Sequence, residues 1–169
     1  MRKYLFCFWI ISLLIVPFTF SFTPLNTKFC RQQSSTLKMT TATNDDSAIR
    51  QLLATYQESL NKSDADLAAS CYTSDGIFMP TTLPTAAGTQ ALKDSYTTIF
   101  GNIQLDVKFI IEELVVTSDT YAYALTSSKG HVTIKATGDR LEEANREIFI
   151  FTKTADDWKI ARYMFNKSS

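Results

Sequence analysis

A glutamate occupies an apolar position of a predicted strand near the end of the chain. Glu147 alternates with Phe149 and Phe151, so the three side chains should point to the same face of that strand. A carboxylate among aromatic residues needs a cation or hydrogen-bond donors to offset the loss of surrounding water. Glu147 is therefore the first candidate for chemistry in this sequence.

The following strand also carries polar residues within an apolar pattern. Arg162 and Asn166 share the alternation of three apolar residues, which are Trp158, Ile160 and Met164. We expect Arg162 to pair with Glu147 across the two strands. Three further polar side chains should lie near the rim of the same region: Asn145, Arg146 and Asn166. The pair could be a structural ion pair, beneath the sheet or at a dimer interface, or part of a ligand site.

The other residues that could do chemistry are predicted to be structural. His131 is the only histidine and alternates with Thr133 and Lys135, which is typical of a solvated strand position. Cys71 lies on an apolar helix face, where a cysteine is more often a core residue than a nucleophile. We expect neither a metal nor a cofactor, because the predicted domain has one histidine and one cysteine and no glycine-rich phosphate loop or EF-hand loop.

The balance of charge argues against a nucleic-acid partner. Lys and Arg together number 17, Asp and Glu together number 17, and the formal net charge is +0. The basic residues are scattered along the sequence and form no stripe. A small or neutral partner is therefore favoured.

The first 44 residues differ in composition from the rest. Residues 1–21 begin with Met-Arg-Lys and continue as an apolar run, which is the pattern of a signal peptide. Residues 22–44 contain no acidic residue and are predicted to be a transit-peptide-like segment or a disordered linker. This order resembles the bipartite presequences of algae with secondary plastids, so a complex plastid is the favoured destination. Secretion and an uncleaved segment that anchors the chain in a membrane are the alternatives.

Residues 45–169 are predicted to begin with three helices. Apolar residues recur at helical spacing over 46–62, over 63–73 and again from Thr89. The first helix has three residues available to cap its start: Asn44, Asp45 and Asp46. Ser63 is the expected cap of the second helix.

Strands are predicted around and after the third helix, because the hydrophobic period changes to two. The expected strands are 76–80, one that begins at Ile103, 121–127, 131–136, 146–154 and 158–165. The doublets Ile110-Ile111 and Glu112-Glu113 interrupt the alternation and predict a bulge. A polar turn is expected at Lys129-Gly130. The order of elements predicts an α+β domain in which a curved sheet wraps the first helix.

Four segments in this order resemble the SnoaL-like branch of the nuclear transport factor 2-like superfamily. They are Tyr56–Asp64, Tyr72–Phe78, Gly88 directly before a helix, and Trp158–Arg162. Within the superfamily the chain is most similar to the branch often labelled SgcJ/EcaC. The resemblance implies a cone-shaped fold with three N-terminal helices packed on a curved, mainly antiparallel sheet. It also implies a mouth that admits a small, mostly apolar ligand of the polyketide or steroid kind.

The resemblance also implies roles for particular residues. Ketosteroid isomerase carries a Tyr four residues before a Leu-Asn pair, as Tyr56 precedes Leu60-Asn61, so Tyr56 could be an oxyanion donor; the alternative is a core aromatic residue. The carboxylate base of that isomerase falls at or beside Pro80, which cannot transfer a proton. The candidate ligand-binding residues are Tyr56, Phe78, Asn145, Glu147, Arg162 and Asn166.

Three functions remain open on this basis. The first is a protein that binds a small ligand in its cone. The second is a non-enzymatic dimerisation or association module, such as this superfamily supplies to nuclear transport factor 2, and a homodimer is the expected assembly. The third is an isomerase or cyclase that uses Tyr56 with a non-standard base. We assign no catalytic residue from the sequence.

Overall fold

The computed structural model describes residues 35–155 and 157–168. The predicted signal peptide and the first part of the transit-like segment lie outside these residues. The elements in chain order are α1 Ser35–Lys62, α2 Ala65–Ser70, β1 Tyr72–Met79, β2 Ala86–Ala87, α3 Thr89–Asn102, β3 Ile103–Val116, β4 Tyr121–Ile134, β5 Arg140–Thr154 and β6 Asp157–Lys167. In the described part of the chain, no helix is both long and apolar enough to cross a membrane.

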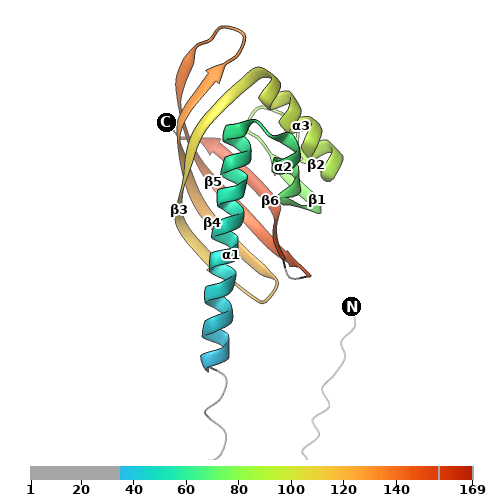
Figure 1. Cartoon of the computed structure of the whole chain (residues 1–169), viewed down its shortest axis with the longest axis vertical. Helices are drawn as coiled ribbons and strands as arrows, with labels where there is room; N and C mark the ends of the chain where they lie inside the picture. The colour runs from blue at the N-terminus through green and yellow to red at the C-terminus, as the bar shows by residue number, and fades with distance from the viewer. Residues whose placement is uncertain (1–34, 156, 169) are drawn as a thin grey trace, which may run out of the picture. The chain divides into compact units, whose positions relative to one another are not determined.

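One six-stranded sheet has the order β2-β1-β6-β5-β4-β3. All neighbours are antiparallel except β1 and β6, which run parallel. The long strands curve around α1, and α2 and α3 lie together beside its C-terminal half (Figure 1). The predicted α+β architecture with a curved, mainly antiparallel sheet is therefore confirmed.

The first helix begins earlier than predicted. It starts at Ser35, because the stretch from there to Asn44 contains no Gly or Pro that would end a helix. Asp45 does not cap the helix: its Oδ1 accepts hydrogen bonds from Lys153 Nζ at 2.8 Å and Trp158 Nε1 at 2.9 Å. One of the three residues predicted to cap the start of α1 thus fastens the helix to β5 and β6.

The second helix is capped one residue later than predicted. Asp64, not Ser63, is the N-cap, and its Oδ1 accepts a hydrogen bond from Leu67 N at 2.9 Å. Ser63 adopts a left-handed backbone with φ 57°, which turns the chain between α1 and α2. The third helix begins at Thr89 as predicted.

The predicted turn at Lys129-Gly130 is wrong, and β4 runs through it as one strand. Gly130 pairs with Val107 of β3, and a Cβ atom on Gly130 would lie only 2.0 Å from the backbone oxygen of Asp106. The glycine therefore marks a close approach of two strands and not a turn. The predicted bulge in β3 is confirmed by a register shift between Ile111 and Glu113.

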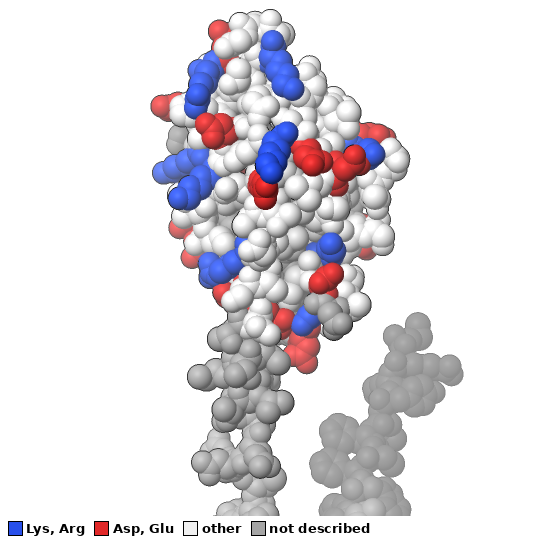
Figure 2. Space-filling view, viewed as in Figure 1, with Lys and Arg blue, Asp and Glu red and all other residues white. Residues whose placement is uncertain are grey.

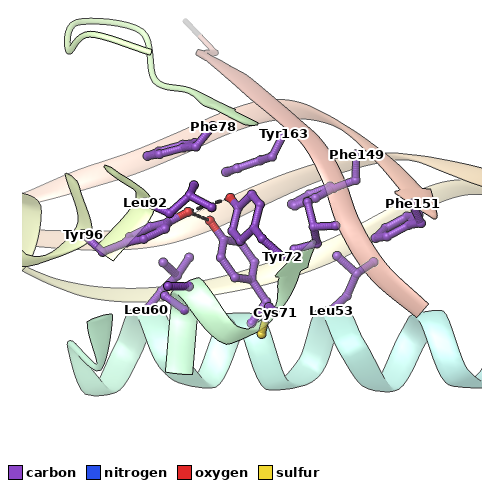
Figure 3. Packing of buried hydrophobic residues seen from close by; sticks show 14 of the residues in the cluster. Leu53, Leu60, Cys71, Tyr72, Phe78, Leu92, Tyr96, Phe149, Phe151 and Tyr163 are labelled. Carbon is purple, nitrogen blue, oxygen red and sulfur yellow. Dashed lines mark hydrogen bonds between the residues drawn. The ribbon is translucent and has the colours of Figure 1, made fainter. Parts of the chain in front are cut away.

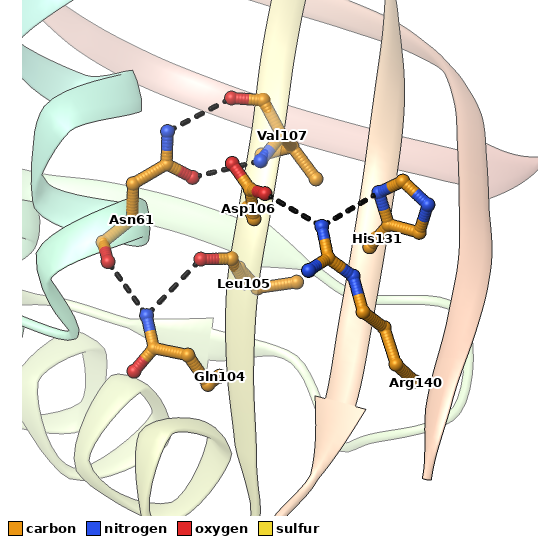
Figure 4. Close-up of polar contacts among 7 residues, drawn as sticks. All are labelled: Asn61, Gln104, Leu105, Asp106, Val107, His131 and Arg140. Atoms are coloured by element: carbon orange, nitrogen blue, oxygen red, sulfur yellow. Dashed lines mark hydrogen bonds and ion pairs between the residues drawn. The ribbon is translucent and has the colours of Figure 1, made fainter.

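Side chains of α1 occupy the free edge of the sheet, which is formed by β3. Asn61 Nδ2 donates to Val107 O and Asn61 Oδ1 accepts from Val107 N, both at 2.9 Å (Figure 4). Gln57 Oε1 accepts from Phe109 N at 2.7 Å. These amides satisfy backbone groups that β4 cannot reach, and they set the position of α1 against the sheet.

The core lies between α1, α3 and the inner face of the sheet, and it is rich in aromatic rings (Figure 3). Tyr56 and Tyr96 come from the two helices, and Phe149 and Tyr163 come from neighbouring strands. The Phe149 and Tyr163 rings stack with centroids 4.1 Å apart. On the face shown in Figure 2, basic and acidic side chains are interspersed.

Candidate functional site

A cavity of about 100 Å³ lies between the helices and the inner face of the sheet. Apolar side chains form most of its lining and come mainly from α1, α3 and β3. Polar side chains from β4, β5 and β6 form another part of the wall: Ser128, Glu143, Asn145, Glu147 and Tyr163. A largely apolar wall with a few convergent polar groups is the usual composition of a small-molecule site.

Glu147 lies at the centre of the polar part of this wall. Three hydroxyl groups donate to its carboxylate: Thr126 at 2.5 Å, Ser128 at 2.9 Å and Tyr163 at 3.2 Å. Burial raises the pKa of the Glu147 carboxyl, and the three hydroxyl donors offset part of that rise. Glu147 takes part in none of the ion pairs formed by the described residues.

Asn145 stands two residues before Glu147 on the same face of β5. Its Nδ2 donates to Ser128 Oγ at 3.3 Å and to Glu143 Oε1 at 3.1 Å. Its Oδ1 is buried and has no hydrogen-bond partner among the described residues. Because a buried acceptor without a partner is costly, this oxygen is a place where a bound molecule would be stabilised.

A chain of tyrosines forms a second polar feature. The Tyr96 hydroxyl lies 2.5 Å from that of Tyr56 and 2.7 Å from that of Tyr72 (Figure 3). Tyr56 and Tyr96 line the cavity, whereas Tyr72 lies behind them. Burial raises the pKa of Tyr56 well above its ordinary value, so its phenol keeps its hydrogen at neutral pH.

The structure brings four of the six predicted ligand-binding residues to this one cavity: Tyr56, Phe78, Asn145 and Glu147. Arg162 and Asn166 are not among its lining residues. The expected ion pair between Arg162 and Glu147 does not form. Arg162 instead donates to the backbone oxygen of Asp75 at 3.2 Å and lies 3.8 Å from its carboxylate.

A bulge in β6 explains this difference. The register between β5 and β6 shifts at this point: Ile150 pairs with Arg162, but the next residue, Phe151, pairs with Ile160. Ala161 is therefore the extra residue of the bulge. After a bulge the alternation of faces reverses. Tyr163 and Phe165 therefore turn inward to the cavity, and Arg162, Met164 and Asn166 turn to the outer face.

The sequence contained a signal for this reversal that the prediction missed. Apolar residues alternate up to Ile160, are adjacent at Ile160-Ala161, and then alternate again at Tyr163 and Phe165. A similar doublet in β3 correctly predicted a bulge. Tyr163 could thus have been assigned to the inner face, whereas Ser128 was missed because the strand was ended before it.

The remaining chemistry-bearing residues lie elsewhere. Cys71 is 2% exposed, and burial raises the pKa of its thiol to about 11, which confirms a core position. His131 is partly exposed on β4, where its Nδ1 lies 3.1 Å from an Arg140 nitrogen that also binds Asp106 (Figure 4). In the described residues, no group of three or more His, Cys, Asp or Glu side chains is placed to hold a metal ion.

Comparison with solved structures places this arrangement among known folds. A ketosteroid isomerase-like protein from Erwinia carotovora atroseptica is 31% identical, with a TM-score of 0.70 over 73% of this chain and 95% of that chain. A hexachlorocyclohexane dehydrochlorinase from Novosphingobium barchaimii shares the fold at 11% identity, with a TM-score of 0.69 over 78% and 91% of the two chains. A conserved protein from Planctomyces limnophilus is 22% identical, with a TM-score of 0.65 over 75% and 99%.

Comparison at the level of sequence agrees with the fold. No curated protein matches the chain. The model of the SnoaL-like domain matches residues 41–164, which include every element from α2 to β5 and most of α1 and β6. The chain therefore belongs to the SnoaL-like domain family, with the nuclear transport factor 2-like fold of its structural neighbours.

Proposed function

We propose that this protein binds a small, largely apolar molecule in the cavity between α1, α3 and the sheet. The observation that carries the proposal is the pairing of an apolar wall with a buried, unpartnered acceptor, Asn145 Oδ1. A donor that reached this acceptor would remove the free-energy cost of burying it without a partner.

The volume of the cavity limits the size of the ligand. At about 100 Å³ it is smaller than the roughly 150 Å³ engineered apolar cavity that binds benzene. The part of a ligand that the cavity encloses in this state of the protein is therefore no larger than one ring. A molecule as large as a steroid or a polyketide requires the wall to move.

Blocking the cavity tests the proposal. Small molecules that co-purify with the protein would be identified by mass spectrometry, and a set of single-ring compounds would be screened by shift in melting temperature. Ile99 lines the cavity from α3, whereas Thr97 is exposed on the same helix. We expect Ile99→Trp to abolish every such signal and Thr97→Trp to retain it. Signals unchanged in Ile99→Trp, or none in the unaltered protein, would contradict the proposal.

Dimerisation through the outer face of the sheet is a second candidate function. Leu125, Ile148 and Met164 lie side by side in register on β4, β5 and β6, and Leu125 and Met164 are 40% and 41% exposed. Ile110 on β3 and Ile150 on β5 add apolar area to the sheet. Adjacent exposed apolar residues on a sheet mark an interaction surface.

Sedimentation tests this assembly. We expect a dimer at micromolar concentration that Met164→Glu dissociates at least tenfold more readily. Leu83→Glu is the control, since Leu83 has the same exposure of 41% but lies in the loop between β1 and β2. A monomeric unaltered protein would remove this candidate and leave the ligand proposal standing.

An isomerase or cyclase is the remaining alternative. It is favoured only by the presence of Glu147 in the same cavity as Tyr56, since position 80 carries no carboxylate. Once a ligand is identified, Glu147→Gln should abolish its turnover and keep its affinity within a few-fold. Turnover that persists in this variant would exclude Glu147 as the base.

A further inference from the structure

The polar part of the cavity wall has used up its hydrogen-bond donors. Both hydrogens of Asn145 Nδ2 are bonded, one to Ser128 and one to Glu143. The hydroxyl hydrogens of Ser128, Thr126 and Tyr163 all go to Glu147. An amide nitrogen has two hydrogens and a hydroxyl has one, so none of these groups has a hydrogen left for a ligand.

The orientation of the Asn145 amide is set by its neighbour. A flipped amide would place Oδ1 beside the Glu143 carboxylate, where two acceptors would face each other. The nitrogen therefore faces Glu143, and Oδ1 is the unpartnered atom. Asn145 is 8% exposed and lines the cavity, but its Oδ1 is itself buried in this state, so a ligand reaches the acceptor only when neighbouring side chains of the wall shift.

The two charged side chains that line this wall, Glu143 and Glu147, are both acidic. Glu143 binds Lys167 at 3.1 Å, but Glu147 is surrounded by hydroxyl groups and is absent from the ion pairs of the described residues. A ligand carboxylate at this wall would be repelled and would find no free donor. A hydroxyl or amino group would donate to Asn145 Oδ1 and remove the cost of its burial.

The tyrosine chain adds one donor elsewhere in the wall. Three phenol groups share two hydrogen bonds, so one hydrogen is left over, at Tyr56, at Tyr72 or, where Tyr96 accepts from both, at Tyr96. A hydroxyl group both donates and accepts, so it is compatible with both polar features. A ketone only accepts and leaves Asn145 Oδ1 without a partner.

We infer that the ligand of this cavity is a compact, single-ring molecule that carries a hydroxyl or amino group, which donates a hydrogen bond to Asn145 Oδ1. The inference rests on the proposed ligand-binding function and narrows it to a class of molecule. It assigns Asn145 as the residue that determines specificity between donors and acceptors of the same size.

Three ring compounds test the inference: cyclohexanol and cyclohexanone, which are matched in size, and cyclohexanecarboxylate, which is larger and charged. Their affinities for the protein would be measured by calorimetry or ligand-observed NMR at pH 7. We expect cyclohexanol to bind about tenfold or more tightly than cyclohexanone, because only the alcohol satisfies the buried acceptor. The carboxylate should show no measurable binding. Equal affinity, or a preference for the ketone, would overturn the inference and leave the binding function intact.

Two variants locate the source of the preference. Asn145→Leu removes the acceptor and keeps the branching of the side chain, and although Leu is bulkier, the ratio of the two affinities should fall to about one because the two compounds have the same size. Glu147→Gln keeps the shape of the side chain and adds N–H donors, so the ketone should bind more tightly to it than to the unaltered protein. This variant is informative even if Asn145→Leu does not fold. An unchanged ratio in both variants would overturn the role of this wall.

The same measurements separate the two proposals. If none of the three compounds binds, and Ile99→Trp gives the same result, then both the inference and the proposed function fail. If at least one compound binds to the unaltered protein and not to Ile99→Trp, the cavity is a binding site and the order of affinities alone decides the inference.

Discussion

At the scale of single residues, Glu147 shows how a carboxylate can be buried without a cation. Its three donors are neutral hydroxyls, so the charged form is solvated by dipoles and not neutralised. The prediction from alternation placed Glu147 correctly among aromatic residues but assigned Arg162 as its partner. Strand alternation shows which face a side chain occupies, but it cannot show where a bulge reverses that face.

Glu147 should make the stability of the protein depend on pH. Its folded pKa is raised above the ordinary value of 4.5, so the stability that it contributes is complete below pH 4.5 and is lost as pH rises through the folded pKa. Glu147→Gln has no such loss. We therefore expect the variant to gain stability relative to the unaltered protein as pH rises from 4 to 8, measured by denaturant unfolding at each pH. A difference that stays constant over this range would show that burial does not shift this carboxyl.

At the scale of elements, the sequence predicted the helices and strands better than their limits. The periodicity of apolar residues predicted α3 and the bulge in β3, because both depend on local patterns of apolar residues. It failed at Gly130, which was predicted to lie in a turn although the residue is required by contact with Asp106 of another strand. That contact is set by tertiary structure, and no local pattern contains it.

The contact between α1 and the edge of β3 should be a major source of stability. Asn61→Leu removes both hydrogen bonds to Val107 and leaves two part-buried backbone groups without partners. We expect a loss of about 1–3 kcal/mol in the free energy of unfolding. Gln51→Leu is the control, because Gln51 is exposed on the same helix and should change stability by no more than about 0.5 kcal/mol. Equal effects of the two substitutions would refute the assigned role of Asn61.

At the scale of the whole molecule, the family and the architecture were predicted correctly, whereas the set of side chains that forms the polar wall was predicted only in part. Short motifs such as Tyr56–Asp64 are distributed along the chain, so their order identifies a fold. Asn61 in that motif has a structural role, because its side chain forms two hydrogen bonds with the backbone of β3. The polar wall depends on side chains from β4, β5 and β6 meeting at one place, and only the folded sheet shows which of them meet.

The hydrogen bonds that join Asp45 of α1 to Lys153 and Trp158 give a second pH-dependent prediction. Burial acts to raise the pKa of Asp45, but the hydrogen bonds from Lys153 and Trp158 and the charge of Lys153 outweigh it, so the folded pKa is lowered. The stability from Asp45 is therefore present above its ordinary pKa of 3.8 and is lost as pH falls through the folded value.

Substitution of Asp45 should reproduce that loss at neutral pH. Asp45→Ala should cost about 1–3 kcal/mol, since it leaves the buried Trp158 N–H without a partner. Asp45→Asn keeps an acceptor for Trp158 and should cost less. Denaturant unfolding at pH 7 measures both. If the two substitutions cost the same, the hydrogen bond to Trp158 contributes nothing.

Asp45 lies 108 residues from Lys153 and 113 residues from Trp158 along the sequence. A ribosome therefore makes α1 long before it makes the strands that hold the helix in place. Until β5 and β6 leave the exit tunnel, α1 has no docking partner at this end, and the last strand already made has an unpaired edge. The nascent chain should thus be most open to chaperones and to pairing with other chains in the interval before its last strand is released.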